Sequence, residues 1–187
     1  NGQLVQKLIS KQEIRLLVFN SLGEDSDDQQ DYSLFIAASI AKDLFIYDSL
    51  GGSILNVFEG GIANQDLKLS KSHTGIITAL FFEGRFLFSG AKDCTIRCWD
   101  IFSSDGPMYT CDGHRATITD ITGFDTFLLS GSADRLSIVW NKSDGSILHK
   151  LDVHTKGVLS LSTSDTIFTS GGADGTICIW DSEKVSV

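Results

Sequence analysis

The sequence predicts an all-β fold made of small repeated sheets, and three observations lead to this prediction. Tryptophans recur about every 40 residues, at Trp99, Trp140 and Trp180. Each tryptophan closes a set in which Ser, Asp and Trp follow a His by 16, 20 and 26 residues. Each repeat also divides into short runs rich in β-branched and aromatic residues, separated by Gly, Asp and Ser, with no helical spacing. A period of this length is typical of repeat architectures.

The middle repeat shows how the strands are expected to divide. We predict strands at residues 116–123, 127–130, 136–140 and 146–151, because turn residues occupy 124–126, 133–135 and 142–145. Each repeat then supplies four short strands, which form one antiparallel sheet.

The recurring His, Ser, Asp and Trp can satisfy one another by hydrogen bonding. We call each set a tetrad. The three tetrads are His73, Ser89, Asp93 and Trp99; His114, Ser130, Asp134 and Trp140; His154, Ser170, Asp174 and Trp180. An indole N–H, a hydroxyl, an imidazole and an acceptor-only carboxylate can form a chain in which each buried group has a partner. Losing one member would leave its partners unsatisfied, at about 1–3 kcal/mol each.

These residues carry a resemblance to the WD-repeat β-propeller family. The marks are Gly113-His114, with weaker forms at 72–73 and 153–154, Ser-Gly at 89–90, 130–131 and 170–171, and the closing pairs at 99–100, 140–141 and 180–181. The resemblance is strong over 72–181 and weak over 1–48. It implies a single partial propeller over 1–187, with repeats at about 1–48, 49–100, 101–141 and 142–181, belonging to a ring of six to eight blades.

The first repeat is divergent. Residues 37–41 (Ala-Ala-Ser-Ile-Ala) replace the Ser-Gly segment, Tyr47-Asp48 replaces the tryptophan pair, and no histidine precedes them. Residues 1–8 match 144–151, so they are expected to form an outer strand. Only 182–187 follow the last closing pair. Either the chain is part of a larger ring, which we favour, or its first strand completes the last sheet.

Serine, histidine and aspartate together could suggest a hydrolase, but the repetition argues against it. A catalytic triad occurs once per active site, whereas this set occurs three times, each with a tryptophan that no hydrolase needs. His149 lies outside the sets, in an expected outer strand, and should face solvent. Residues 24–28 resemble the start of a calcium loop, but Gln29 and Gln30 do not suit it. We therefore expect no catalytic residue, no cofactor and no metal.

The cysteines suggest reduced thiols. Cys94, Cys98, Cys111 and Cys178 include no C-x-x-C pair, and Cys98 shares its strand position with Val139 and Ile179, which predicts a buried thiol. With no signal-like stretch and no apolar run near 18 residues, we expect an intracellular protein, cytoplasmic or nuclear, without membrane insertion.

The net charge of −9 disfavours direct binding to nucleic acid, which needs clustered Lys and Arg. Five acidic residues fall within 24–31, an insertion that we interpret as a solvated loop, the alternative being a docking site for a basic partner.

The family resemblance implies a partner-binding face. It brings the loop before the first inner strand together with the turn between the second and third, and the 24–31 loop to the opposite face. The candidate residues are Lys71, Thr74, Lys92, Arg115, Arg135, Thr155 and Lys156, with Cys94 beside them. The leading hypothesis is a noncatalytic scaffold or adaptor in a multiprotein complex, binding protein or peptide partners that include acidic or phosphorylated segments. The alternatives are a substrate-recognition subunit of a ubiquitin-ligase-type complex, an RNA-associated WD-repeat subunit and, least favoured, an enzyme.

Overall fold

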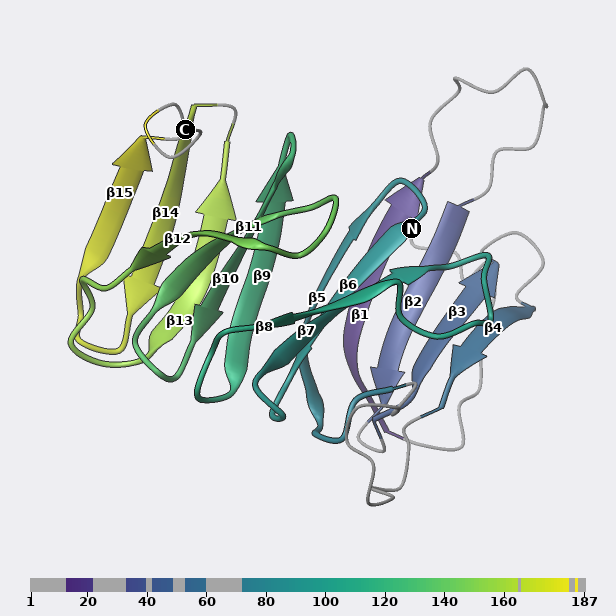
Figure 1. Ribbon diagram of the computed structural model, residues 1–187. Helices are drawn as coiled ribbons and strands as arrows, with labels where there is room; N and C mark the ends of the chain where they lie inside the picture. The colour runs from purple at the N-terminus through teal and green to yellow at the C-terminus, as the bar shows by residue number, and fades with distance from the viewer. Residues whose placement is uncertain are drawn as a thin grey trace, which may run out of the picture.

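The computed structural model describes residues 13–21, 33–39, 42–48, 53–59, 72–164, 166–181 and 184. These residues form four sheets (Figure 1). The first contains β1 (Ile14–Ser21), β2 (Ser33–Ser39), β3 (Leu44–Asp48) and β4 (Ile54–Phe58). The second contains β5 (Ile77–Glu83), β6 (Phe86–Ala91), β7 (Thr95–Asp100) and β8 (Tyr109–Asp112). The third contains β9 (Ile118–Phe124), β10 (Phe127–Ser132), β11 (Ser137–Asn141) and β12 (Ile147–Leu151). The fourth contains β13 (Val158–Thr163), β14 (Ile167–Gly172) and β15 (Ile177–Asp181).

Each sheet is an antiparallel meander whose strands follow their order in the chain. The first strands of successive sheets, β1, β5, β9 and β13, pack against one another, so the sheets stand side by side like blades around an axis (Figure 1). The all-β fold and the partial propeller that the sequence predicts are confirmed. Residues 1–8 and 24–31, and the expectations that rest on them, lie outside the described residues.

The observed strands of the middle repeat differ from the predicted ones by one or two residues at their ends. β9 begins at Ile118 rather than at 116, because the two preceding residues belong to a loop that is hydrogen bonded to the next turn. Ser132 Oγ donates to the carbonyl of Ala116 at 3.1 Å, and the N–H of Ala133 donates to the carbonyl of Thr117 at 3.0 Å. The loop before β9 is therefore fixed to the β10–β11 turn.

The hydrophobic core lies between the sheets. Leu44, Ile46 and Phe58 of the first sheet pack against Leu87 and Trp99 of the second. A second cluster joins the second and third sheets and includes Phe88, Ile96, Ile118, Leu128 and Trp140. A smaller cluster of Leu129, Val139 and Phe168 joins the third and fourth. Each junction removes apolar surface from water on both of its sheets, which stabilises neighbouring repeats together.

The glycines of the first two Ser-Gly marks permit this close packing. A Cβ on Gly90 would lie 2.5 Å from Ile118 Cγ2, and one on Gly131 would lie 2.7 Å from Val158 Cγ1. Both distances are shorter than real Cβ contacts, so a side chain there would push the next sheet away. Gly90 and Gly131 are thus required by the neighbouring repeat rather than by their own.

The far side of the fourth sheet is uncovered in the described part of the chain. Ile177 and Ile179 of β15 are 76% and 70% exposed, whereas Val139, at the position of Ile179 one repeat earlier, is 1% exposed. The difference arises because the third sheet has a following sheet and the fourth does not. None of the described residues form a helix that is long and apolar enough to cross a membrane.

Candidate partner-binding face

The tetrad of the third sheet is a continuous hydrogen-bonded chain. Trp140 Nε1 donates to Ser130 Oγ at 2.8 Å, and this hydroxyl lies 2.8 Å from His114 Nε2. His114 Nδ1 lies 2.9 Å from Asp134 Oδ2. Because a carboxylate can only accept, His114 donates through Nδ1 and accepts the serine proton at Nε2.

The other two tetrads have the same connections. In the second sheet, Ser89 Oγ lies 2.7 Å from Trp99 Nε1 and 2.8 Å from His73 Nε2, and His73 Nδ1 lies 2.9 Å from Asp93. In the fourth sheet, Trp180 Nε1 lies 3.2 Å from Ser170 Oγ, and His154 lies 2.8 Å from this hydroxyl. The distance from His154 to Asp174 is longer, at 3.3 Å. The fourth tetrad is therefore the loosest, and it belongs to the sheet with one uncovered side.

Burial and hydrogen bonding set the ionisation of these groups. Burial lowers the pKa of His114, against the opposing effect of its bond to Asp134, so the neutral ring is favoured. Burial alone would raise the pKa of Asp134, but hydrogen bonds from Arg115, Leu136 and His114 outweigh it and hold that pKa below its ordinary value. A neutral histidine beside an ionised aspartate matches the hydrogen-bond directions given above.

The tetrad aspartate also joins two segments of the face. Asp134 Oδ2 accepts the backbone N–H of Arg115 at 2.8 Å, and Oδ1 accepts that of Leu136 at 3.0 Å. One carboxylate thus holds both the loop before β9 and the turn between β10 and β11. Asp174 does the same for Thr155 and Thr176, at 2.7 and 3.0 Å. The side chains carried by these segments are consequently presented on a fixed backbone.

Each β-turn at this end places one residue in the left-handed region. These residues are Lys42, Cys94, Arg135 and Gly175, with φ values of 74°, 69°, 81° and 81°. Only glycine adopts this conformation without a steric cost. Arg135 therefore occupies a strained position at which the fourth sheet has glycine.

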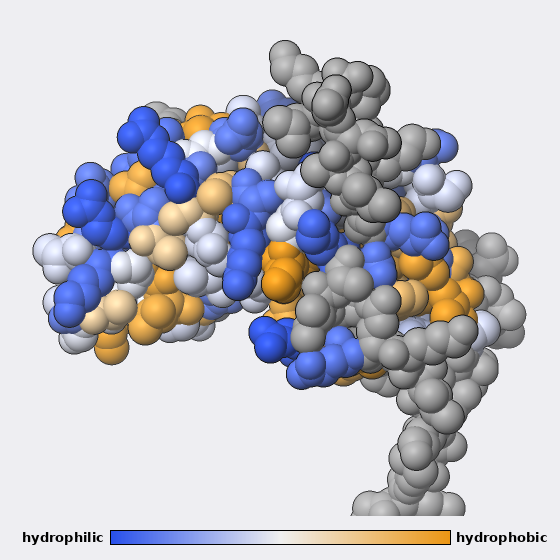
Figure 2. All heavy atoms as spheres, turned by 90° about the horizontal axis from the view of Figure 1, so that it is seen from below, coloured by the Kyte–Doolittle hydropathy of each residue, from blue (hydrophilic) through white to orange (hydrophobic). Residues whose placement is uncertain are grey.

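The structure brings the predicted partner-binding residues to one end of the sheets, except for Lys71, which lies outside the described residues. Figure 2 views this end and shows hydrophilic residues across much of its described surface, with smaller hydrophobic areas between them. Lys92, Arg115, Arg135, Thr155 and Lys156 are exposed, whereas Thr74 is half-buried. Among the described residues, the exposed acids at the same end are Glu13, Glu59, Asp112 and Asp152. The tetrad carboxylates are largely buried and engaged in hydrogen bonds, so the exposed cations outnumber the exposed acids in the described loops of the second to fourth sheets, whereas the first sheet adds Glu13 and Glu59.

One prediction about histidine is wrong. His149 of β12 does not simply face solvent, because its ring is half-buried and Nε2 is buried without a hydrogen-bond partner among the described residues. The cause is the packing of the outer strand against its sheet, where His149 pairs with Val139. The buried thiol is found as predicted, since Cys98 is 2% exposed and burial raises its pKa to about 11.

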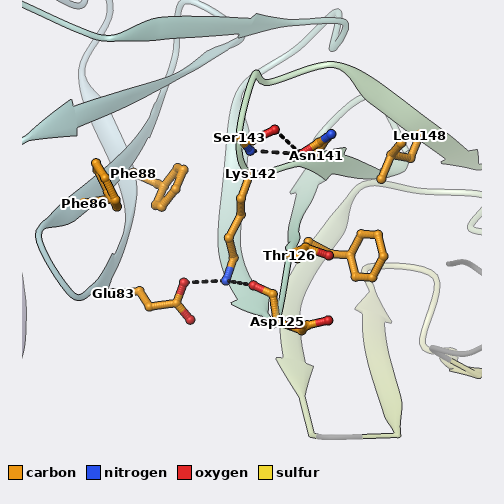
Figure 3. Close-up of a pocket in the computed structure, with 10 residues that line it drawn as sticks. Glu83, Phe86, Phe88, Asp125, Thr126, Asn141, Lys142, Ser143 and Leu148 are labelled. Carbon is orange, nitrogen blue, oxygen red and sulfur yellow. Dashed lines mark hydrogen bonds and ion pairs between the residues drawn. The ribbon is translucent and has the colours of Figure 1, made fainter. Parts of the chain in front are cut away.

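A pocket that was not predicted from the sequence lies at the opposite end of the sheets. It has a volume of about 680 Å³ and lies between the second and third sheets, where the β5–β6, β9–β10 and β11–β12 turns meet (Figure 3). Phe86, Phe88, Phe127 and Leu148 supply its apolar walls. A signal was present in the sequence, because Phe86 and Phe127 occupy the same position, just after the turn, in successive repeats.

Lys142 reaches across this pocket to the second sheet. Its Nζ pairs with Glu83, donates to the carbonyl of Asp125 at 2.7 Å and lies 5.6 Å from the ring centre of Phe81 (Figure 3). Gly123 makes room for it, since a Cβ there would lie 2.6 Å from Phe81 Cε1 and 2.9 Å from Lys142 Cε. Because Lys142 and Glu83 are 59 residues apart, no local pattern predicts the pair.

Meandering sheets set side by side around an axis, three of the four closed by a Trp–Ser–His–Asp chain, define a propeller built from sequence repeats. The family model described as "WD domain, G-beta repeat" matches residues 65–100, 105–141 and 145–181, which is more than half of the chain. The chain belongs to the WD40 repeat family.

Comparisons with known proteins agree with a partial propeller. The chain is 36% identical over 119 residues to Telomerase Cajal body protein 1 of Homo sapiens, a match that covers 59% of this chain and 21% of that protein. It spans less than a quarter of the length of the curated relatives that it matches. The crystal structure of the computationally designed Ika4 protein is similar at a TM-score of 0.78 and 26% identity, covering 97% of this chain and 99% of that one. The WD40 β-propeller domain of Doa1 is similar at a TM-score of 0.66 and 22% identity, covering 91% of this chain and 52% of that one.

Proposed function

We propose that this protein is a noncatalytic interaction module that binds protein partners through the tetrad end of its sheets, as part of a multiprotein complex. The single observation that carries this proposal is the double role of Asp134. Its two carboxylate oxygens hold the segments that bear Arg115 and Arg135, two exposed cations that come from different loops. The backbone beneath both side chains is therefore ordered before any partner binds, which lowers the entropic cost of association.

The charge on this end favours an acidic or phosphorylated segment as the partner. The chain carries a net charge of −9, yet Lys92, Arg115, Arg135 and Lys156 are exposed together in these loops. Guanidinium groups bind carboxylate and phosphate oxygens through paired hydrogen bonds, so Arg115 and Arg135 suit such a ligand better than lysines would. A complementary field would also speed association in a salt-dependent way.

The tetrad groups supply stability rather than reactivity in this proposal. Ser130 Oγ already interacts with both Trp140 and His114, and it is fully buried. A nucleophile needs access to its substrate, so this hydroxyl is unsuited to catalysis. The same arrangement occurs in three sheets, which is expected of a repeated structural element. Recognition of substrates for a ubiquitin-ligase-type complex would be one use of such a module.

The proposal can be tested by charge reversal. We expect Arg115→Glu combined with Arg135→Glu to abolish capture of the main protein partner from a cell extract, with the unfolding midpoint unchanged. Arg85→Glu combined with Lys184→Glu is the matched control, because it changes the net charge equally at two exposed cations of the opposite end. If the first pair still captures the partner as well as the control pair does, this end of the sheets is not the binding face.

A further inference from the structure

The pocket between the second and third sheets has the size and lining of a binding site. A volume of about 680 Å³ lies within the range of pockets that hold small ligands or a few side chains. Two of its apolar residues are accessible, since Phe86 and Leu148 are 36% and 38% exposed. They lie on opposite sides of the space in Figure 3, with Phe86 on the second sheet and Leu148 on the third. A bulky apolar group could thus enter between them.

The charges around the pocket decide what else the ligand must carry. Lys142 is already paired with Glu83 and donates to the Asp125 carbonyl. Arg85 is paired with Asp100, its Nε lying 3.1 Å from Asp100 Oδ1. Both cations at this edge are therefore satisfied within the molecule, and neither is available to an anionic ligand.

The carboxylates at the pocket are in excess. Asp125 lines the pocket, is exposed, and has no ion-pair partner within the part of the chain that the structure describes. Asp144, in the turn that follows Lys142, is a further exposed acid at this edge. Asn141 also lines the pocket, and its side-chain oxygen accepts from Ser143 N–H at 2.9 Å (Figure 3). The site consequently presents apolar walls beside uncompensated negative charge, which favours a ligand that is apolar and cationic.

We propose that this pocket binds a peptide segment in which a bulky aliphatic or aromatic side chain lies next to a lysine or arginine. The apolar side chain enters between Phe86 and Leu148, and the cation pairs with Asp125. The site lies at the opposite end of the sheets from the tetrads, so it is separate from the partner-binding face and could be occupied at the same time.

The test is an NMR titration of the 15N-labelled chain with the probe N-acetyl-leucyl-arginine amide. We expect the largest amide shifts in residues 83–86, 125–127 and 141–148. Replacing the probe's arginine with citrulline, which is neutral and nearly the same shape, should weaken binding by about two- to fivefold, the range for an exposed charge pair. Added salt should reduce the affinity of the arginine probe more than that of the citrulline probe.

Two matched pairs of variants complete the test. Asp125→Asn introduces a residue that tolerates the φ of 45° at this turn. It should reduce the affinity for the arginine probe to that for the citrulline probe. Asp152→Asn removes the same charge at the opposite end and should have no effect.

Leu148→Ala should abolish binding, whereas Leu55→Ala, at the equivalent position of the first sheet's outer strand, should not. Shifts that map elsewhere, or equal affinity for the arginine and citrulline probes, would overturn the proposal. Charge reversal at Arg115 and Arg135 should leave the titration of the pocket unchanged. The proposed pocket ligand and the proposed partner-binding face can therefore be rejected independently of each other.

Discussion

The hydroxyl of Thr119 in β9 donates a hydrogen bond to the carbonyl of Val158 in β13, at 2.7 Å, and thereby joins the innermost strands of the third and fourth sheets. Thr78 of β5 makes the same bond to the carbonyl of Ile118 one repeat earlier. The corresponding residue of the fourth sheet is Leu159, which is 58% exposed. Polar side chains at this position therefore act between repeats, and they have this effect only where another sheet follows.

We expect Thr119→Val to destabilise the protein by about 1–2 kcal/mol, because it leaves the Val158 carbonyl without this donor while preserving the shape of the side chain. Urea unfolding followed by tryptophan fluorescence measures the loss. Leu159→Thr places the same hydroxyl where no sheet follows among the described residues, and it should change stability by less than about 0.5 kcal/mol. Equal effects of the two substitutions would show that the bond between sheets contributes nothing.

Two buried serines of the third sheet provide a test of the tetrad. Ser130→Ala removes the hydroxyl that interacts with Trp140 and His114, so we expect a loss of about 2 kcal/mol or more. Ser137 is equally buried, but its Oγ has no hydrogen-bond partner among the described residues. Ser137→Ala should therefore be neutral or slightly stabilising. Thermal unfolding of both variants decides the matter, and similar midpoints would contradict the structural role given to the tetrad.

Stability should fall in two steps as the pH is lowered. Burial lowers the pKa of His114 in the folded state below its ordinary 6.5, so the unfolded chain takes up this proton first and stability decreases below about pH 6.5. Burial alone would raise the pKa of Asp134, but hydrogen bonds from Arg115, Leu136 and His114 hold it below its ordinary 3.8. Protonation of Asp134 therefore causes a second loss of stability below about pH 3.8. Asp120 acts in the opposite direction. Burial raises its pKa in the folded state, so the folded chain takes up this proton first and the contribution of Asp120 to stability grows on acidification.

Urea titrations between about pH 7.5 and pH 5 measure the first step. His114→Gln should lower the stability overall and reduce its pH dependence in that range, since the side chain no longer titrates. A variant that retained the full dependence would assign the step to another group.

Arg135→Gly should make the protein more stable and weaker in binding. The φ of 81° at position 135 costs an L-residue about 1–2 kcal/mol, and glycine avoids this cost. Part of the gain is offset because glycine has greater conformational freedom in the unfolded chain. We expect a net gain of about 0.5 kcal/mol, together with reduced capture of the partner. Arg135→Asn, which tolerates this conformation better than arginine, should behave similarly. Reduced stability in the glycine variant would show that the arginine side chain contributes more to the fold than its backbone strain costs.

The sequence alone determined the repeat, the all-β class and the four residue types of the tetrad, because these features recur in phase along the chain. Spacing was enough to separate a repeated structural set from a single catalytic site. Strand ends were predicted to within one or two residues in the middle repeat. Thr117 has a β-forming side chain, but it and Ala116 are held in a loop by Ala133 and Ser132.

Only the tertiary structure decided which side chains meet across the junctions between sheets. Thr119 reaches Val158, and Lys142 spans the pocket to Glu83. These contacts join residues from different strands or different repeats, and alternation along a single strand does not specify them. Their physical cause is the close approach of neighbouring sheets, which glycines such as Gly90 and Gly131 permit and which the buried apolar clusters stabilise.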